Sequence, residues 1–111
     1  MVAKGWTVET LNSTVDREIG ALPADMRTRL QRFRGLIEEF GFDGVPPNSL
    51  RKLRGPLWEF RITGRDGISR ALYVTAHDRR VVIVRVFVKK TRRTPTREIE
   101  LALRRAREIS R

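Results

Sequence analysis

Residues 57–88 read LWEFRITGRDGISRALYVTAHDRRVVIVRVFV, and this stretch predicts three β-strands joined by two tight turns. In the first strand, residues 57–62, aromatic and aliphatic residues alternate with charged ones, as in a strand with one buried face. The turns are predicted at GRDG (residues 64–67) and AHDR (residues 76–79). Residues 80–88 carry Val, Ile and Phe on both faces, so they predict a strand in the interior of a sheet. Hairpin connections make the pairing antiparallel.

The chain before these strands predicts one short strand and a helical hairpin. Residues 5–11 alternate in hydropathy, which indicates a strand. Ser13 is expected to cap a helix that ends at Pro23. A second helix, residues 24–40, carries one apolar stripe at spacings of three and four. The residues of this stripe, which we expect in the core, are Met26, Leu30, Phe33, Ile37 and Phe40.

A loop and a last helix complete the predicted order. Residues 41–56 are rich in Gly and Pro and predict a loop. Thr94 is expected to cap the last helix, with Pro95 in its first turn. The order is then β-α-α-β-β-β-α, an α+β class with a small, mostly antiparallel sheet. A length of 111 residues corresponds to one domain, residues 1–111.

The charge is strongly positive and unevenly distributed. The formal net charge is +11, from 24 Lys and Arg against 13 Asp and Glu. Residues 1–50 have a net charge of −1, whereas residues 51–111 have +12. A charge concentrated in this way indicates a polyanionic partner. The alternative is an Arg-rich solubility surface or a codon usage that favours Arg, because 20 of the 24 cations are Arg.

The composition excludes several kinds of site. Without Cys, the chain has no disulfide, no thiolate metal site and no Cys nucleophile. His77, its one His, lies in a predicted turn, where it is either solvated or a catalytic group. No phosphate-binding glycine motif and no metal-binding motif is present, so we expect no cofactor and no metal.

The sequence also predicts a location away from membranes. No apolar run reaches the ~18 residues of a membrane span. Charged residues interrupt the first 25 positions, so no signal-peptide apolar region is predicted. The predicted helices lack the basic face opposite an aromatic and aliphatic face that a membrane surface requires. We therefore expect a cytoplasmic protein with no membrane partner.

Basic residues recur at the ends of the predicted strands and in the adjoining loops. A sheet face rimmed by two basic loops makes a positive groove that suits a phosphodiester backbone. An Arg within a half-buried strand, such as Arg61, Arg70 or Arg85, needs a partner for its charge. For one of these arginines, an ion pair with a carboxylate such as Glu59 is the alternative to phosphate binding.

Two motifs resemble those of a known family. Residues 52–62, KLRGPLWEFRI, resemble the K-L-x-G-x-L-W-E-L-R segment of RelE/HigB-like toxins of bacterial type II toxin–antitoxin systems. FVKKT (residues 87–91) and TPTREIELA (residues 94–102) resemble the F-x-K-K-T…T-P-x-x-E-I-x-x-A end of the phage-associated HigB-like branch. Many members of that branch carry His-Gly before the Phe of the last strand, where this chain has Arg85-Val86.

The resemblance implies a RelE-like fold and a metal-independent mRNA endoribonuclease, commonly active on the translating ribosome. In this chemistry the RNA 2′-OH is the nucleophile, and cleavage leaves a 2′,3′-cyclic phosphate and a 5′-OH. The resemblance also implies a cognate antitoxin that blocks the site, expected to be a HigA-like helix-turn-helix protein.

Matching the motifs assigns candidate roles to the basic residues. Arg61 and Arg70 are predicted to clamp the phosphate, because a guanidinium binds phosphate oxygens in pairs. Lys89 and Lys90 are predicted to serve as acid, base or backbone contacts. The other candidate RNA contacts are Arg51, Lys52, Arg54, Arg85, Phe87, Arg92 and Arg93, of which Phe87 is either a stacking platform or a core residue.

Two other functions remain open at this point. ParE-type toxins share the architecture that the resemblance implies, but they inhibit DNA gyrase. A non-enzymatic module that binds RNA or the ribosome would carry the same net charge. Loss of cleavage with retained affinity in an Arg61→Ala variant distinguishes an enzyme from a binding module.

Overall fold

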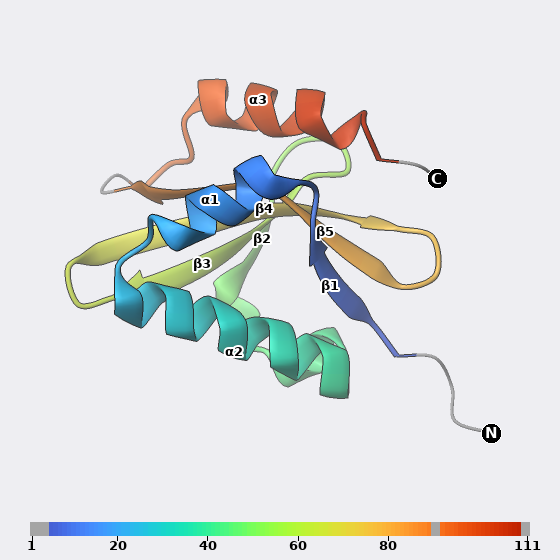
Figure 1. Ribbon diagram of the computed structural model, residues 1–111, viewed down its shortest axis with the longest axis horizontal. Coiled ribbons are helices and arrows are strands. Elements are labelled where there is room, and N and C mark those ends of the chain that lie inside the picture. Colours follow the sequence, from blue (N-terminus) through green and yellow to red (C-terminus); the bar gives the residue numbers. More distant parts are fainter. Residues whose placement is uncertain (1–4, 90–91, 110–111) are drawn as a thin grey trace.

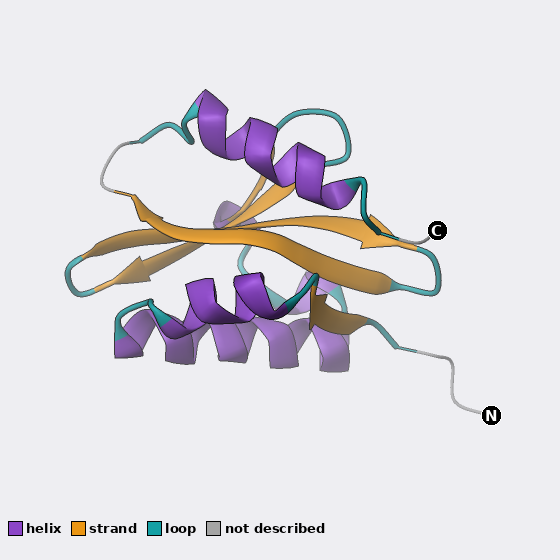
Figure 2. Ribbon diagram, turned by 45° about the horizontal axis from the view of Figure 1, so that its top comes forward, coloured by secondary structure: helices purple, strands orange, loops and turns teal. Residues whose placement is uncertain are grey.

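The computed structural model describes residues 5–89 and 92–109, which form a five-stranded sheet between two helical layers. Helices α1 and α2 cover one face of the sheet, and α3 covers the other (Figure 1, Figure 2). The strands are β1 (Thr7–Thr10), β2 (Leu50–Lys52), β3 (Trp58–Gly64), β4 (Gly67–Ala76) and β5 (Arg80–Lys89). The helices are α1 (Ser13–Gly20), α2 (Ala24–Phe40) and α3 (Thr96–Ala106), with short 3₁₀ helices at Phe42–Gly44 and Pro47–Ser49.

The sheet has the strand order β1-β5-β4-β3-β2. β1 runs parallel to β5, and all other neighbouring strands are antiparallel. Gly67, Asp78 and Arg79 have positive φ angles in the two hairpin turns, which is the backbone that tight hairpins favour. The predicted α+β class with a mostly antiparallel sheet is therefore confirmed. The predicted interior strand at residues 80–88 is also confirmed, because β5 lies between β1 and β4.

Each face of the sheet carries its own apolar core. Under α1 and α2, the rings of Phe33, Phe60 and Tyr73 stack in a row, with centroid separations of 5.8 and 4.2 Å. Under α3, Leu72 and Val84 pack around Ala102 together with other buried aliphatic residues. Full burial of one such side chain contributes roughly 1.5–3 kcal/mol, so these two cores set how the helices sit on the sheet.

Two predicted helix caps are wrong. Asn12, rather than Ser13, caps α1, because its side chain accepts a backbone N–H of the first turn at 3.1 Å. Thr94 does not cap α3, since its hydroxyl donates to the carboxylate of Glu59 on the sheet. Pro95 occupies the N-cap position of α3 instead. The competing carboxylate comes from a distant strand, which local spacing does not reveal.

The predicted loop at residues 41–56 is wrong in one respect, because it contains β2 and the two 3₁₀ helices. β2 has three residues, two of them charged, so it shows no alternation of its own. The prediction that Phe40 is a core residue is also wrong, since its side chain is 60% exposed. Phe40 is the last residue of α2, and the chain turns away at Gly41, where φ is 74°.

Candidate nucleic-acid interface

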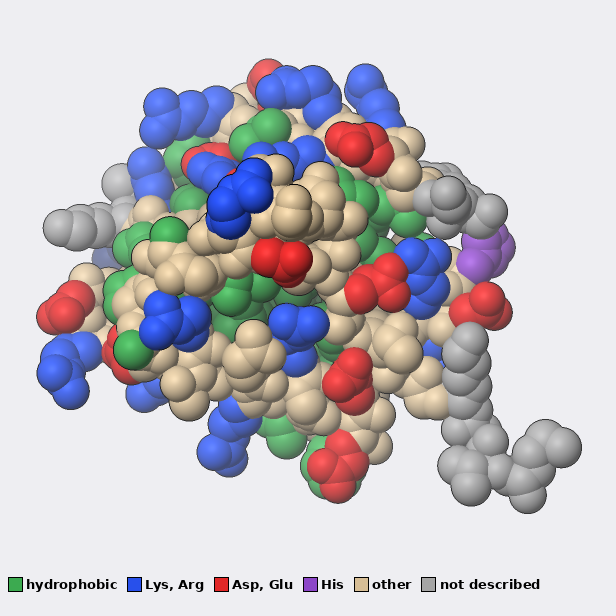
Figure 3. Space-filling view, in the orientation of Figure 1, with side chains coloured by type: hydrophobic (Ala, Val, Ile, Leu, Met, Phe, Trp, Pro, Cys, Tyr) green, Lys and Arg blue, Asp and Glu red, His purple; other side chains and the backbone are tan. Residues whose placement is uncertain are grey.

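A basic cavity lies between the loop that precedes β3 and the connection from β5 to α3. Its volume is about 310 Å³. Its lining residues are Arg51, Lys52, Leu53, Arg54, Arg93, Thr94 and Ile99. Four of these residues are cations, and none is a carboxylate. We call this cavity the basic groove. Basic side chains also lie over α3, at the top of the view in Figure 3, with acidic side chains among them. The fold thus brings two basic segments that are far apart in the sequence to one site.

One wall of the basic groove is held by β2 and the β2–β3 loop. Arg51 lies opposite Glu59 in the sheet, and Lys52 lies opposite Trp58. The Lys52 ammonium is 5.8 Å from the centroid of the Trp58 ring, a cation–π contact. The loop turns at Gly55, whose φ of 56° is a conformation that glycine adopts without strain. This wall is therefore held by strand pairing and by a tight turn.

A buried ion pair ties the other wall to the sheet. The side chains of Glu59 on β3 and Arg70 on β4 are 0% and 1% exposed, and Arg70 Nη1 lies 3.0 Å from Glu59 Oε2. Arg70 Nη2 donates to the carbonyl oxygen of Arg92 at 2.7 Å. The hydroxyl of Thr94 donates to the other oxygen of Glu59. The pair therefore anchors the segment that carries Arg92 and Arg93.

Arg61 is an exposed cation beside this ion pair. Residues 61 and 70 are register partners on β3 and β4, so they lie on the same face of the sheet. Like charges at such positions repel, but Glu59 neutralises Arg70. Among the residues that the structure describes, the exposed Arg61 side chain has no ion-pair partner. Arg61 is thus the accessible guanidinium of the two.

The end of β5 and the connection to α3 carry further predicted contacts. Lys89 is half-buried and lies opposite Ile68. Arg92 and Arg93 are exposed in the connection to α3. Lys90, also predicted as a site residue, lies outside the described residues.

Three predicted contacts are engaged with other side chains of the protein: Arg70 and Phe87 are buried, and Arg85 is partly exposed. Arg70 is buried with Glu59, so its guanidinium does not face solvent. Phe87 is only 9% exposed and packs in the core beneath α3, so it presents no open ring face to a base. Arg85 is 5.5 Å from the Phe87 ring and is also bound by two carboxylates. None of these three side chains lines the basic groove.

The sequence of this chain matches a known protein family over most of its length. The family model described as "Phage derived protein Gp49-like (DUF891)" matches residues 17–107. The chain belongs to the Gp49-like family. The match extends from α1 beyond the end of α3, so both walls of the basic groove lie within it. A search of curated proteins found no significant match.

The fold of this Gp49-like protein is similar to those of solved toxins. One is a free-state mutant of the E. coli toxin RelE, with a TM-score of 0.61, 17% identity, and coverage of 91% of this chain and 97% of that chain. Another is from the archaeal RelE–RelB complex of Pyrococcus horikoshii OT3, with a TM-score of 0.51, 20% identity, and coverage of 76% and 94%. At these identities the similarity establishes the fold, and the expected RelE-like fold is confirmed.

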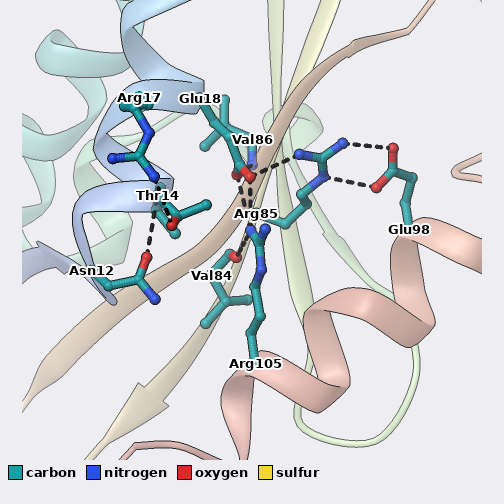
Figure 4. A network of polar contacts seen from close by, with 10 residues as sticks. Asn12, Thr14, Arg17, Glu18, Val84, Arg85, Val86, Glu98 and Arg105 are labelled. Carbon is teal, nitrogen blue, oxygen red and sulfur yellow. Dashed lines mark hydrogen bonds and ion pairs between the residues drawn. The ribbon is translucent and has the colours of Figure 1, made fainter.

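An ion-pair network joins α1, β5 and α3 in the Gp49-like protein (Figure 4). Arg85 Nε and Nη2 donate to the two oxygens of Glu98 at 2.7 and 3.0 Å, and Arg85 Nη1 lies 2.8 Å from Glu18. Arg105 donates to Glu18 at 3.0 Å and to the carbonyl oxygen of Val84 at 2.9 Å. Beyond the end of β1, these side chains cover the edge of β5 that would otherwise be open.

The acid stability of the protein is expected to depend on Glu98. The paired hydrogen bonds from Arg85 hold the pKa of Glu98 below its ordinary value of 4.5. A carboxylate whose pKa is lowered in the folded state stabilises the protein at pH values above its ordinary pKa. That stability is lost as the pH falls through the folded-state pKa. Urea unfolding between about pH 6 and pH 3 should therefore show a smaller decrease for Glu98→Gln than for the wild type. Glu100→Gln, an exposed site on the same helix, should keep the wild-type decrease, and equal decreases in all three proteins would contradict the prediction.

A larger cavity on the α2 side of β3 was not indicated by the sequence. Its volume is about 630 Å³. Its lining residues are Arg29, Arg32, Phe33, Leu36, Gly44, Pro46, Asn48, Ser49, Arg61 and Thr63. The pattern of α2 marks Arg29 and Arg32 only as exposed positions three residues apart. Their convergence on Arg61 depends on how α2 packs against the sheet.

His77 and the acidic residues form no recognisable catalytic or metal centre in the described part of the chain. His77 is exposed and borders an apolar cavity that is lined by no carboxylate. Within residues 5–89 and 92–109, no group of three or more metal-ligating side chains could hold an ion. No helix in these ranges has the length and apolar character needed to cross a membrane.

Proposed function

We propose that the Gp49-like protein, as one domain over residues 1–111, is the toxin of a type II toxin–antitoxin system and cleaves mRNA on the ribosome. The observation that carries the proposal is the basic groove, which has four cations and no carboxylate. Such a surface binds a phosphodiester backbone. The exposed Arg61 lies on the same strand as Glu59, which binds Thr94 in the wall of this groove. The RelE-like fold supports a toxin, and the motifs at residues 52–62 and 87–102 support the HigB-like branch.

In the proposed reaction the RNA supplies its own nucleophile. The 2′-oxygen loses its proton and forms a bond to phosphorus, while the bond between phosphorus and the 5′-oxygen breaks. The leaving 5′-oxygen takes up a proton, so the products are a 2′,3′-cyclic phosphate and a 5′-OH. Arg61 binds the non-bridging oxygens in pairs and stabilises the charge of the transition state. The reaction needs no metal and no cofactor.

The other basic residues take supporting parts in this proposal. Lys89 and Lys90 exchange protons with the 2′- and 5′-oxygens. Arg70 acts from beneath the site, because it holds both Glu59 and the segment that follows β5. The residues that bind flanking phosphates are Arg51, Lys52, Arg54, Arg92 and Arg93. Arg85 and Phe87 hold α3 on the sheet, since Arg85 pairs with Glu98 and Phe87 packs in the core beneath that helix.

The proposed activity takes place in the cytoplasm and involves three partners. These are mRNA, the ribosome and a cognate antitoxin, which we expect to be a HigA-like helix-turn-helix protein. The archaeal RelE structure that this fold resembles is a complex with RelB, which supports an antitoxin partner.

Inducible expression in growing bacteria tests the proposal. Wild type, Arg61→Ala and Arg65→Ala are compared, with primer extension on an abundant mRNA; Arg65 is a matched exposed arginine in the next turn. Growth arrest with new in-frame 5′ ends, absent only in Arg61→Ala, supports an mRNA endoribonuclease. Arrest with intact mRNA would overturn it in favour of a ParE-like gyrase inhibitor. Normal growth with folded protein would overturn it in favour of a non-enzymatic RNA- or ribosome-binding module.

RNA binding by the basic groove is expected to depend strongly on salt. Four phosphate contacts on a single strand predict a slope of about −3 for log affinity against log salt concentration. Affinity should then fall roughly 50-fold between about 50 and 200 mM salt. The Lys52→Ala/Arg54→Ala double variant should lower the magnitude of the slope by about 1.4 units, whereas Arg104→Ala/Arg107→Ala should leave it near the wild-type value. A flat salt response measured by fluorescence anisotropy would argue against a phosphate-binding groove.

A further inference from the structure

The larger cavity on the α2 side of β3 has an apolar floor. Phe33 and Leu36 from α2 and Pro46 from the following loop contribute to its lining. The Phe33 ring stacks on the buried Phe60 ring at 5.8 Å, which fixes the floor to the core of the sheet. A preformed apolar cavity of about 630 Å³ can accept one or two aliphatic side chains of a partner.

The rim of this cavity is cationic. Arg29 and Arg32 are exposed on α2, and Arg61 is exposed on β3. No carboxylate lines the cavity. None of the three has an ion-pair partner among the residues that the structure describes. A partner that places carboxylates at this rim is electrostatically complementary to it.

The strand beside the cavity has an open edge. β4 pairs with β3 along its whole length, from Trp58 to Gly64. β2 pairs with β3 only from Trp58 to Phe60. From Arg61 to Gly64, the outer edge of β3 therefore has no strand beside it within the described residues. Such an edge offers backbone groups to which an extended polypeptide can add as a further strand.

We propose that this edge and cavity bind an extended, acidic segment of a partner protein, with aliphatic side chains inserted on the floor and carboxylates at the arginine rim. The assignment of that partner as the antitoxin rests on the proposed function. A polypeptide fits better than RNA, because the open edge requires a backbone with N–H and C=O groups. The floor is also largely aliphatic, and its one ring already stacks on Phe60, whereas bound RNA bases use open aromatic faces.

Arg61 gives this surface a regulatory consequence. It belongs to the rim of the cavity and is also the exposed cation beside the buried Glu59–Arg70 pair. A carboxylate bound to Arg61 from the cavity side neutralises the group that we propose to contact the phosphate. The partner therefore inhibits cleavage without covering the basic groove itself.

The test is a binding measurement with defined probes on the full chain. The probes are a labelled peptide of about ten residues that alternates Glu and Leu, an equally charged peptide that alternates Glu and Ser, and a single-stranded RNA of about ten nucleotides. The Arg29→Glu/Arg32→Glu double variant reverses two rim charges on α2. The control, Arg104→Glu/Arg107→Glu, reverses two exposed arginines at the same spacing near the end of α3. Circular dichroism confirms that both variants are folded.

We expect the Glu–Leu peptide to bind more tightly than the Glu–Ser peptide. Reversal of Arg29 and Arg32 should weaken binding of the Glu–Leu peptide at least about tenfold. The control variant should bind this peptide, and the Arg29→Glu/Arg32→Glu variant should bind the RNA, within about threefold of the wild-type affinity. Similar losses in both double variants, or equal binding of the two peptides, would overturn the proposal. Loss of RNA affinity alone would assign the cavity to RNA. The peptide measurement requires no cleavage activity, so it can succeed or fail independently of the proposed function.

Discussion

Arg61→Ala is expected to lower the rate of RNA cleavage at least about 100-fold, the cost of removing one donor to a developing oxyanion. Arg61 is exposed on β3, and its register partner Arg70 is buried and paired with Glu59, so Arg70 does not replace it at the surface. Arg61→Lys keeps the charge but loses the planar fork, and should recover only part of the rate. Because the side chain is exposed, the free energy of unfolding should change by no more than about 0.5 kcal/mol.

Single-turnover cleavage of a ribosome-bound mRNA, measured beside RNA affinity, separates chemistry from binding. Arg61→Ala should lose rate while it keeps most of its affinity, since the four cations of the basic groove are unchanged. Arg65→Ala removes an exposed arginine from the β3–β4 turn and should cleave like the wild type. A parallel loss of rate and affinity in Arg61→Ala would mean that the residue only binds RNA.

Glu59→Gln is expected to destabilise the protein by about 3–5 kcal/mol, a large part of a typical total of about 5–15 kcal/mol. The substitution leaves the buried Arg70 guanidinium without its counter-charge. It also weakens the hydrogen bond that Glu59 accepts from the hydroxyl of Thr94. The wall of the basic groove that contains Thr94 therefore loses part of its attachment to the sheet. The reverse change, Arg70→Met, leaves a buried carboxylate and should be similarly costly.

Urea unfolding measures both effects. Glu9→Gln is the matched control, because Glu9 pairs with Arg80 at 2.5 Å but the two side chains are 41% and 32% exposed, so the loss should stay below about 1 kcal/mol. The double variant Glu59→Leu/Arg70→Met replaces the pair by apolar groups and should recover much of the stability lost in either single variant. If Glu59→Gln is no less stable than Glu9→Gln, the buried pair does not anchor this part of the fold.

Strands β1, β3, β4 and β5 and the second helix could be predicted because their signals are local. Residues 57–88 alternate in hydropathy or are apolar on both faces, and the intervening turns have short, polar sequences. The stripe of α2 predicted Met26, Leu30 and Ile37 in the core, and all three are buried. Phe40 follows the same period, but it is the last residue of α2 and its side chain is 60% exposed.

The errors arose where a distant group competes with a local one. Thr94 has the composition of a helix cap, but Glu59 on β3 binds its hydroxyl. β2 is a strand because β3 offers it an edge, and its own three residues carry no periodic signal. The cavity bordered by Arg29 and Arg32 likewise exists only once α2 has packed on the sheet.

Local periodicity, turn chemistry and composition predicted the order of the helices and of strands β1, β3, β4 and β5, the two hairpins that join β3, β4 and β5, and the concentration of positive charge in residues 51–111, but they did not predict β2. The sequence also marked Arg61 and Arg70 as cations within strands. The folded chain settles which of the two is neutralised: Glu59 pairs with Arg70, and Arg61 stays exposed. The environment of each charge depends on strand register and on which segment returns over it, here the one that contains Thr94. Neither is encoded by the spacing of the arginines along the chain.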